Sequence, residues 1–153
     1  MHRRPSPICF LVLSLVFATA AFGQLSGRVV GVHDGDTLTV LDAEKTQHKI
    51  RLSAIDAPEI GQDFGQEAKH QLSDLTFGKT VMIEGNKIDR HGRRVAKVLI
   101  NGRDANLEMV VVGLAWWYKD YQREQSSRDR EIYNAAEADA RSRKLGLWST
   151  GSP

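Results

Sequence analysis

The first half of the chain alternates between apolar and polar residues, a pattern that predicts short β-strands. Residues 37–41 show it clearly, because Leu38 and Val40 alternate with threonines, as in a strand with one buried face. Other strands are expected where β-branched and aliphatic residues concentrate. These segments are residues 27–33, 49–55, 80–84 and 93–100. Five short strands are therefore predicted in the first two thirds of the chain.

The segment 49–55 also sets the direction of one basic side chain. Ile50, Leu52 and Ala54 fall on one face of this strand. Arg51 falls on the other face, since successive side chains of a strand point to opposite sides. We therefore expect Arg51 to project away from the core, towards solvent or a ligand.

Three other segments carry apolar residues at helical spacing. The first ends at Gly78, and its apolar positions are Ala68, Leu72 and Leu75. The second begins with Asp104 or Asn106 as the N-cap, and its apolar stripe is Leu107, Val110, Val111 and Leu114. The third runs from about Ser126 to Lys144, and its narrow apolar seam is Ile132, Ala136 and Ala140. This order of strands and helices predicts an α+β fold: a five-stranded β-barrel of the OB-fold type with three helices.

Residues 1–23 have the pattern of a secretory signal peptide. Two arginines precede an apolar run of about 15 residues, and small residues follow it, so cleavage is expected near Gly23–Gln24. An uncleaved membrane anchor is the alternative, although the run is shorter than the roughly 20 residues that span a bilayer. The sole cysteine, Cys9, lies in this segment. Residues 24–153 are then a single domain without disulfides, exported to the periplasm or the medium.

Removal of that segment leaves the protein close to neutral. The whole chain has 21 Lys and Arg against 19 Asp and Glu, and the first 23 residues hold two of the arginines and no acid. Affinity for nucleic acid must then come from local clusters of basic residues.

Three segments carry residues suited to phosphate chemistry. In Asp34-Gly35-Asp36-Thr37 the first two residues predict a hairpin turn, whereas Asp36 lies beyond what a turn needs. In Asp56-Ala57-Pro58-Glu59 two carboxylates flank a proline after the Arg51 strand. The carboxylates of Asp36 and Asp56 with the Ala57 carbonyl would suit a hard divalent cation, although each segment alone can be an ordinary solvated turn.

The third segment, Asp89-Arg90-His91-Gly92-Arg93-Arg94, is a glycine-centred turn with three arginines. A solvated basic hairpin is the ordinary interpretation. Arginine also binds phosphate through two parallel hydrogen bonds, which lysine cannot do. Arg51 and Arg93 are therefore candidates to hold one phosphate from two directions.

Taken in order, these segments resemble the staphylococcal nuclease family over roughly residues 27–149. Three further pieces contribute to the resemblance: Ile50-Arg51-Leu52, Gly113-Leu114-Ala115 and Leu145-Gly146-Leu147-Trp148. The resemblance implies that Asp36, Asp56 and the Ala57 carbonyl bind Ca²⁺. It also implies that Glu59 is the general base or orients the attacking water, and that Arg51 and Arg93 hold the phosphate and stabilise the transition state.

The resemblance implies less about how the substrate is gripped. The segment 59–68 is shorter than in the archetype of the family and lacks its lysines. Arg90, Tyr118 and Tyr121 are candidate substrate contacts, and the tyrosine rings could stack on bases of any sequence. At least one of Trp116 and Trp117 is expected to pack in the core.

We therefore expect an exported, monomeric, Ca²⁺-dependent nuclease that cleaves DNA and RNA internally and leaves 3′-phosphate ends, with no stable membrane association. The alternative from another class is a non-catalytic OB-fold module that binds nucleic acid, since a fold does not confer activity. A third possibility is a structural or partner-binding domain with an acidic pocket. The presence of all five catalytic and metal-binding side chains favours the enzyme, because a binding module has no need to keep them together.

Overall fold

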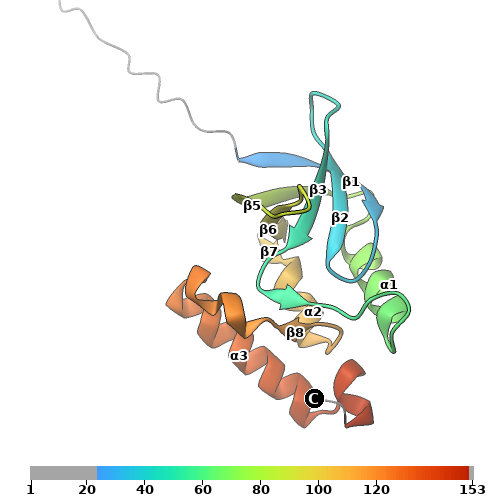
Figure 1. Ribbon diagram of the computed structural model, residues 1–153, viewed down its shortest axis with the longest axis vertical. Coiled ribbons are helices and arrows are strands. Elements are labelled where there is room, and N and C mark those ends of the chain that lie inside the picture. The colour runs from blue at the N-terminus through green and yellow to red at the C-terminus, as the bar shows by residue number, and fades with distance from the viewer. Residues whose placement is uncertain (1–23, 152–153) are drawn as a thin grey trace, which may run out of the picture.

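The computed structural model describes residues 24–151 and contains a closed barrel of five strands (Figure 1). The barrel strands are β1 (Leu25–Val32), β2 (Thr37–Leu41), β3 (Gln47–Leu52), β5 (Thr80–Ile88) and β6 (Arg94–Ile100). Neighbouring strands pair antiparallel in the order β3-β2-β1-β5-β6, and β3 closes the barrel by pairing parallel with β6. The predicted α+β class and five-stranded barrel are confirmed.

The structure has three α-helices, as predicted. They are α1 (Gly65–Thr76), α2 (Ala105–Val111) and α3 (Ser127–Ser142), with short 3₁₀ helices η1 (Lys119–Glu124) and η2 (Gly146–Thr150). Asp104 caps α2 by accepting a hydrogen bond from the Leu107 amide at 3.1 Å, so it is the N-cap rather than Asn106. Ser126 caps α3 by accepting from the Asp129 amide at 3.0 Å. In Figure 1, α1 lies beside the barrel and α3 lies across one end of the molecule.

The predicted strand over residues 49–55 was wrong at its end. β3 stops at Leu52, and the chain restarts in β4 (Ile55–Asp56), which pairs with β8 (Trp116–Trp117) in a separate two-stranded sheet. Between them Ala54 has a φ of 63°, a conformation that cannot continue a strand. This break turns the chain back towards the end of β3, which matters for the site below.

The strand predicted over residues 80–84 was too short. β5 continues to Ile88, and its register with β6 shifts between Glu84 and Lys87, as at a β-bulge. Gly85 permits this bulge because its φ is 136° and a Cβ atom there would lie 2.6 Å from the Val95 carbonyl oxygen. The longer strand places Lys87 at the end of the barrel where Arg51 lies, because both residues pair with Val95 of β6.

The predicted apolar seam of α3 was also wrong in part. The buried residues of α3 are Tyr133, Glu137 and Ala140, whereas Ile132 is 38% exposed. Tyr133 faces inward because its hydroxyl donates to Asp104 Oδ2 at 2.9 Å. Glu137 is buried because its Oε1 accepts from the Trp117 amide at 3.0 Å. Tyr133 also belongs to the hydrophobic core, so apolar packing and these two hydrogen bonds together place this face of the helix inward.

The second predicted stripe differs at its end, because α2 stops at Val111 and this side chain is 38% exposed. The core consists mainly of inward-facing strand residues such as Val29, Val40, Ile50, Val81 and Val98, joined by Ala68 and Leu72 of α1 and Met109 of α2. Among residues 24–151, no helix combines the length and apolar character needed to cross a membrane. The predicted signal peptide, residues 1–23, lies outside the described residues.

Candidate active site

Arg51, at the end of β3, is held by four oxygen atoms of the protein. Its Nη1 donates to the carbonyl oxygens of Leu52 at 2.8 Å and Ile55 at 2.9 Å. Its Nη2 donates to Asp56 Oδ1 at 2.9 Å and lies 3.1 Å from Asp36 Oδ2. The second carbonyl is within reach because the chain turns back after β3. The Arg51 side chain points away from the core face of β3, as predicted, and its hydrogen bonds fix its position.

Asp36 lies in the loop between β1 and β2, where its side chain is 9% exposed. Its backbone amide donates to Asp34 Oδ1 at 3.0 Å, which tightens the turn. Its own carboxylate accepts from the Thr37 hydroxyl at 3.0 Å and from the Ala57 amide at 2.9 Å. Burial raises the pKa of Asp36 to about 7, although the Arg51 charge opposes the rise. The loop is thus the predicted turn, and it also holds a buried carboxylate whose charge a nearby cation would stabilise.

Gly35 allows this loop to pack closely against two other segments. A Cβ atom at Gly35 would lie 2.6 Å from the Ala68 Cβ atom and 2.7 Å from the Ala57 Cβ atom. Without a side chain, the loop can approach both α1 and the segment after β4. This close packing keeps Asp36 beside Ala57.

Asp36 and Asp56 are suited to share a cation. Both carboxylates lie within 3.1 Å of the same Arg51 nitrogen, so they face a common point. Asp56 has a side chain that is 52% exposed, which leaves access from solvent. In the described part of the chain, no three His, Cys, Asp or Glu side chains gather into a metal site. A divalent cation would therefore need backbone or water oxygens as well, and the Ala57 carbonyl stays the predicted one.

Arg93 is fixed by a hairpin that joins β5 to β6. Asp89 Oδ1 accepts from the amides of His91 at 2.8 Å and Arg93 at 2.9 Å. Asp89 Oδ2 accepts from Arg93 Nε at 2.8 Å. Burial alone would raise the pKa of Asp89, but the hydrogen bonds from Arg93 and His91 outweigh it and lower the pKa to about 2. The carboxylate therefore stays ionised and holds the Arg93 side chain in place.

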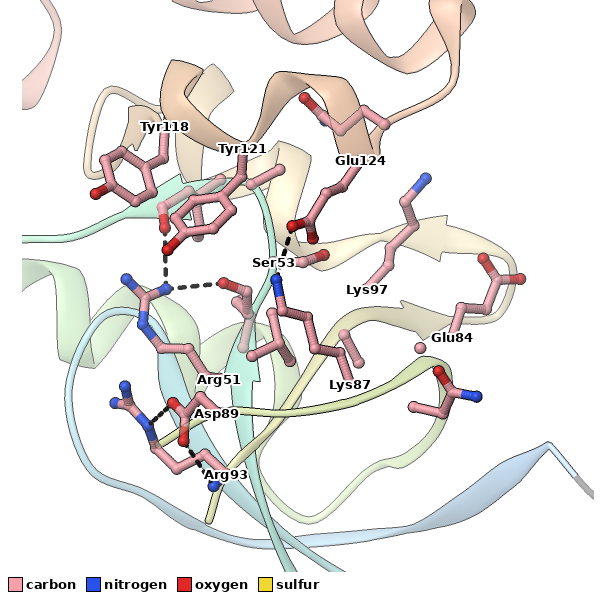
Figure 2. Close-up of a pocket in the computed structure, with 18 of the residues that line it drawn as sticks. Arg51, Ser53, Glu84, Lys87, Asp89, Arg93, Lys97, Tyr118, Tyr121 and Glu124 are labelled. Carbon is pink, nitrogen blue, oxygen red and sulfur yellow. Dashed lines mark hydrogen bonds and ion pairs between the residues drawn. The ribbon is translucent and has the colours of Figure 1, made fainter. Parts of the chain in front are cut away.

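Arg51 and Arg93 line one open cleft of about 760 Å³ (Figure 2). Arg90, Tyr118 and Tyr121 line the same cleft. The two tyrosine rings have centroids 5.1 Å apart and are tilted by 55°. Figure 2 shows Tyr118 and Tyr121 on the side of the cleft opposite Asp89 and Arg93, with Arg51 between them. The five predicted phosphate and substrate contacts thus share one space, and their individual roles stay predictions.

Glu59 lies outside the set of residues that line this cleft. It is exposed in the loop between β4 and α1, and its carboxylate forms no hydrogen bond or ion pair within residues 24–151. Its backbone is held, because its amide donates to Gln62 Oε1 at 2.7 Å and its carbonyl accepts from the Gln62 amide at 2.8 Å. The structure therefore leaves the predicted role of Glu59 as a prediction.

Trp117 packs as predicted for at least one of the two tryptophans. It is 8% exposed, and its Nε1 donates to Gln125 Oε1 at 2.8 Å. Its pairing with Ile55 joins β8 to β4. In the next residue, the Tyr118 amide donates to the Ala54 carbonyl at 2.8 Å. These contacts place the tyrosines beside Arg51.

Among the residues of the cleft that the sequence did not indicate, two form an ion pair. Lys87 and Glu124 both line the cleft and form an ion pair of 2.7 Å. Lys87 was missed because the predicted strand ended before it. Glu124 was missed because no spacing along the chain relates it to Lys87. Gly85 is the signal in the sequence for Lys87, because a glycine within a strand suggests a β-bulge after which the strand continues.

This arrangement is able to bind a phosphodiester and to stabilise the charge that develops when it is attacked. Arginine donors fixed in advance need little rearrangement as the reaction proceeds, which is an effective form of catalysis. The adjoining carboxylates supply oxygen ligands for a hard cation. The tyrosines offer aromatic surfaces for unpaired bases.

Comparison with known proteins agrees with this geometry. A model of the family described as staphylococcal nuclease homologue matches residues 49–150. An uncharacterized endonuclease of Haemophilus influenzae is 38% identical over 153 residues, which is all of this chain and 83% of the relative. A micrococcal nuclease of Shigella flexneri is 38% identical over 144 residues, covering 88% of this chain and 80% of the relative.

Proposed function

Because the chain belongs to the staphylococcal nuclease family, we propose that it is a Ca²⁺-dependent nuclease that hydrolyses phosphodiester bonds in DNA and RNA. The observation that carries the proposal is the meeting of Arg51 and Arg93 in one cleft, each fixed by carboxylates of the protein. The two relatives named above are called a nuclease and an endonuclease, which supports internal cleavage. The 3′-phosphate ends rest on the family resemblance.

Asp36, Asp56 and the Ala57 carbonyl would hold the Ca²⁺ ion. The two carboxylates already share one cationic neighbour, and the burial of Asp36 favours a second positive charge nearby. A bound Ca²⁺ ion supplies Lewis acidity at a phosphate oxygen. Arg51 stays held by the Leu52 and Ile55 carbonyls if the carboxylates turn to another cation.

The protein's own side chains divide the remaining work. Arg51 and Arg93 bind the scissile phosphate and stabilise its additional negative charge. Glu59 orients a water molecule and accepts its proton, a role for which an exposed carboxylate without a partner is available. Tyr118, Tyr121 and Arg90 contact the neighbouring nucleotide.

We also propose that the protein is exported, to the periplasm or the medium, and acts there as a monomer without membrane attachment. The charged n-region, apolar run and small residues of positions 1–23 support export. The absence of cysteine from residues 24–153 suits an oxidising compartment.

The test is digestion of heat-denatured DNA by purified protein with Ca²⁺ and then with a calcium chelator. We expect digestion in Ca²⁺ and none in the chelator. Glu59→Gln and Arg93→Ala should each lower the rate by about 100-fold or more, since each removes a group that acts in the transition state. Circular dichroism should show that both variants stay folded.

Several results would count against the proposal. Digestion that persists in the chelator would exclude metal dependence. A protein that binds DNA in Ca²⁺ but never cleaves it would be a binding module of the same fold. A wild-type rate in either variant would remove that residue from the mechanism. Gln62 is not a suitable control position because its Oε1 accepts from the Glu59 amide, so exposed Arg103→Ala is preferred.

A further inference from the structure

Lys87 bridges the two walls of the cleft. It lies near the end of β5, and its Nζ atom is 2.7 Å from Glu124 Oε1 at the end of η1. The same ammonium group lies 5.0 Å from the centroid of the Tyr121 ring. Figure 2 shows the Lys87 side chain extending from the lower strand towards Glu124, beside Tyr121. It therefore occupies space beside an aromatic ring that a base could use.

The ion pair between Lys87 and Glu124 can be replaced by another contact at little cost in stability. The Lys87 and Glu124 side chains are 53% and 51% exposed. Water and salt screen an ion pair of this kind, so it adds little to stability. The hydrogen bond that Lys87 donates to Glu124 raises the pKa of Lys87, so the ammonium stays charged. A backbone phosphodiester offers the same charge as Glu124, and its two non-bridging oxygens accept charge-assisted hydrogen bonds as a carboxylate does.

Two other cations of the cleft, Arg93 and Lys97, are held more firmly than Lys87. Arg93 binds a carboxylate that is itself fixed by backbone amides. Lys97 lies between Asp129 at 2.9 Å and Asp104 at 3.5 Å, with a side chain that is 22% exposed. Lys87, by comparison, has one exposed acidic partner on a long, flexible side chain. Lys87 is therefore better able than Arg93 or Lys97 to move to a ligand.

We propose that Lys87 is a movable phosphate ligand that Glu124 holds beside Tyr121 until a single-stranded polynucleotide enters the cleft. When the strand enters, Lys87 leaves Glu124 for a backbone phosphate next to the one at Arg51 and Arg93. The same movement uncovers the Tyr121 ring for an unpaired base. A single strand fits because its bases are free to stack on protein rings. The inference rests on the proposed function in placing the polynucleotide in this cleft.

The two partners of the bridge should then have opposite effects on binding. We would measure the dissociation constant of a fluorescent oligodeoxythymidylate at low salt, in chelator so that no cleavage occurs. Lys87→Met should weaken binding about fivefold and lower the salt dependence by about 0.7 in slope, the value for one phosphate contact to a single strand. Glu124→Gln should strengthen binding about twofold, because Lys87 no longer has a competing partner.

The double variant separates exchange from simple repulsion. If Glu124 acts by holding Lys87, Glu124→Gln should have little effect once Lys87→Met is present. An undiminished effect would mean that Glu124 merely repels the strand, which overturns the exchange. Weaker binding in both single variants would mean that the bridge only supports the cleft, and this also overturns it. If the wild-type protein does not bind the oligonucleotide, the proposal is overturned as well.

Two controls complete the experiment. Arg103 and Glu108 form a pair of 2.8 Å outside the cleft, so Arg103→Met and Glu108→Gln should leave binding unchanged. Lys87→Met should weaken binding of the single strand more than it weakens binding of a duplex of equal length. An equal loss for both would contradict the proposal that an unpaired base stacks on Tyr121. Because binding is measured without hydrolysis, a protein that binds as expected but never cleaves would contradict the proposed function alone. If the wild-type protein cleaves DNA but Lys87→Met binds the oligonucleotide as tightly as the wild type does, this inference alone is contradicted.

Discussion

Arg51 uses both terminal nitrogens of its guanidinium on oxygen atoms of its own chain. Lysine cannot replace this planar set of donors, because its three donors radiate from a single nitrogen. We therefore expect Arg51→Lys to lower kcat by about 100-fold or more. It should also lower the free energy of unfolding by about 1–3 kcal/mol, since carbonyl oxygens lose their donors.

Steady-state kinetics and urea denaturation would check both expectations. Arg103→Lys is the matched control, because Arg103 has one exposed ion pair with a side chain that is 72% exposed. It should leave both quantities unchanged. Retention of full activity in Arg51→Lys would show that charge alone is sufficient at this position.

Asp89 provides a prediction about pH. Its pKa in the folded protein is about 2, below the ordinary value of 3.8, so ionised Asp89 stabilises the fold. This contribution is fully present above about pH 5 and is lost as the pH falls towards 2. Asp89→Asn should therefore cost about 1–2 kcal/mol of unfolding free energy at pH 7, and the difference from wild type should shrink on acidification. Urea denaturation across this pH range would measure it, and a difference independent of pH would contradict the assignment.

The site residues differ in how well the sequence predicts them. Asp36, Arg51, Asp56 and Arg93 stand in short local motifs, and the structure brings these motifs together. Lys87 and Glu124 meet only in the folded chain, so no local pattern indicates their contact. Polar contacts between distant exposed residues depend on where elements end, and element ends are the least predictable feature of a sequence.

At the scale of elements, α3 shows how hydrogen bonds add to apolar packing in deciding which face of a helix is buried. Its predicted seam began at Ile132, but the helix buries Tyr133 and Glu137 because they have polar partners inside. Ile132→Ser should therefore change the unfolding free energy by less than about 0.5 kcal/mol. Tyr133→Ala should cost about 3–5 kcal/mol, as for other large buried aromatic residues. Thermal and urea unfolding would distinguish the two positions, and a larger cost at Ile132 would restore the original seam.

The strands were predicted better in their centres than at their ends. Alternation of apolar residues, or a concentration of β-branched and aliphatic residues, identified all five barrel strands, because one face of each packs in the core. It failed after Leu52 and after Glu84, where backbone conformations at Ala54 and Gly85 redirect the chain. Those two positions decide where Arg51 and Lys87 point, so the fold was more predictable than the details of the cleft.

At the scale of the whole molecule, the small net charge limits how nucleic acid is bound. The chain has a formal charge of +2, and its basic side chains are balanced by nearly as many acids. We expect contacts with only a few phosphates, chiefly through the arginines and Lys87 of the cleft. The logarithm of KM for denatured DNA should then rise with the logarithm of salt concentration with a slope of about 2–3. Kinetics at fixed Ca²⁺ and varied salt would measure it, and a much steeper slope would indicate an extended binding surface.

The parallel pairing of β3 with β6 closes the barrel and also brings the two arginines to the same cleft. Contacts between segments so distant in the chain tend to form late in folding, because their loops must close first. An unfolded chain therefore carries all the predicted site residues but has no cleft in which they meet. The topology of the barrel thus makes assembly of the site depend on closure of the whole barrel.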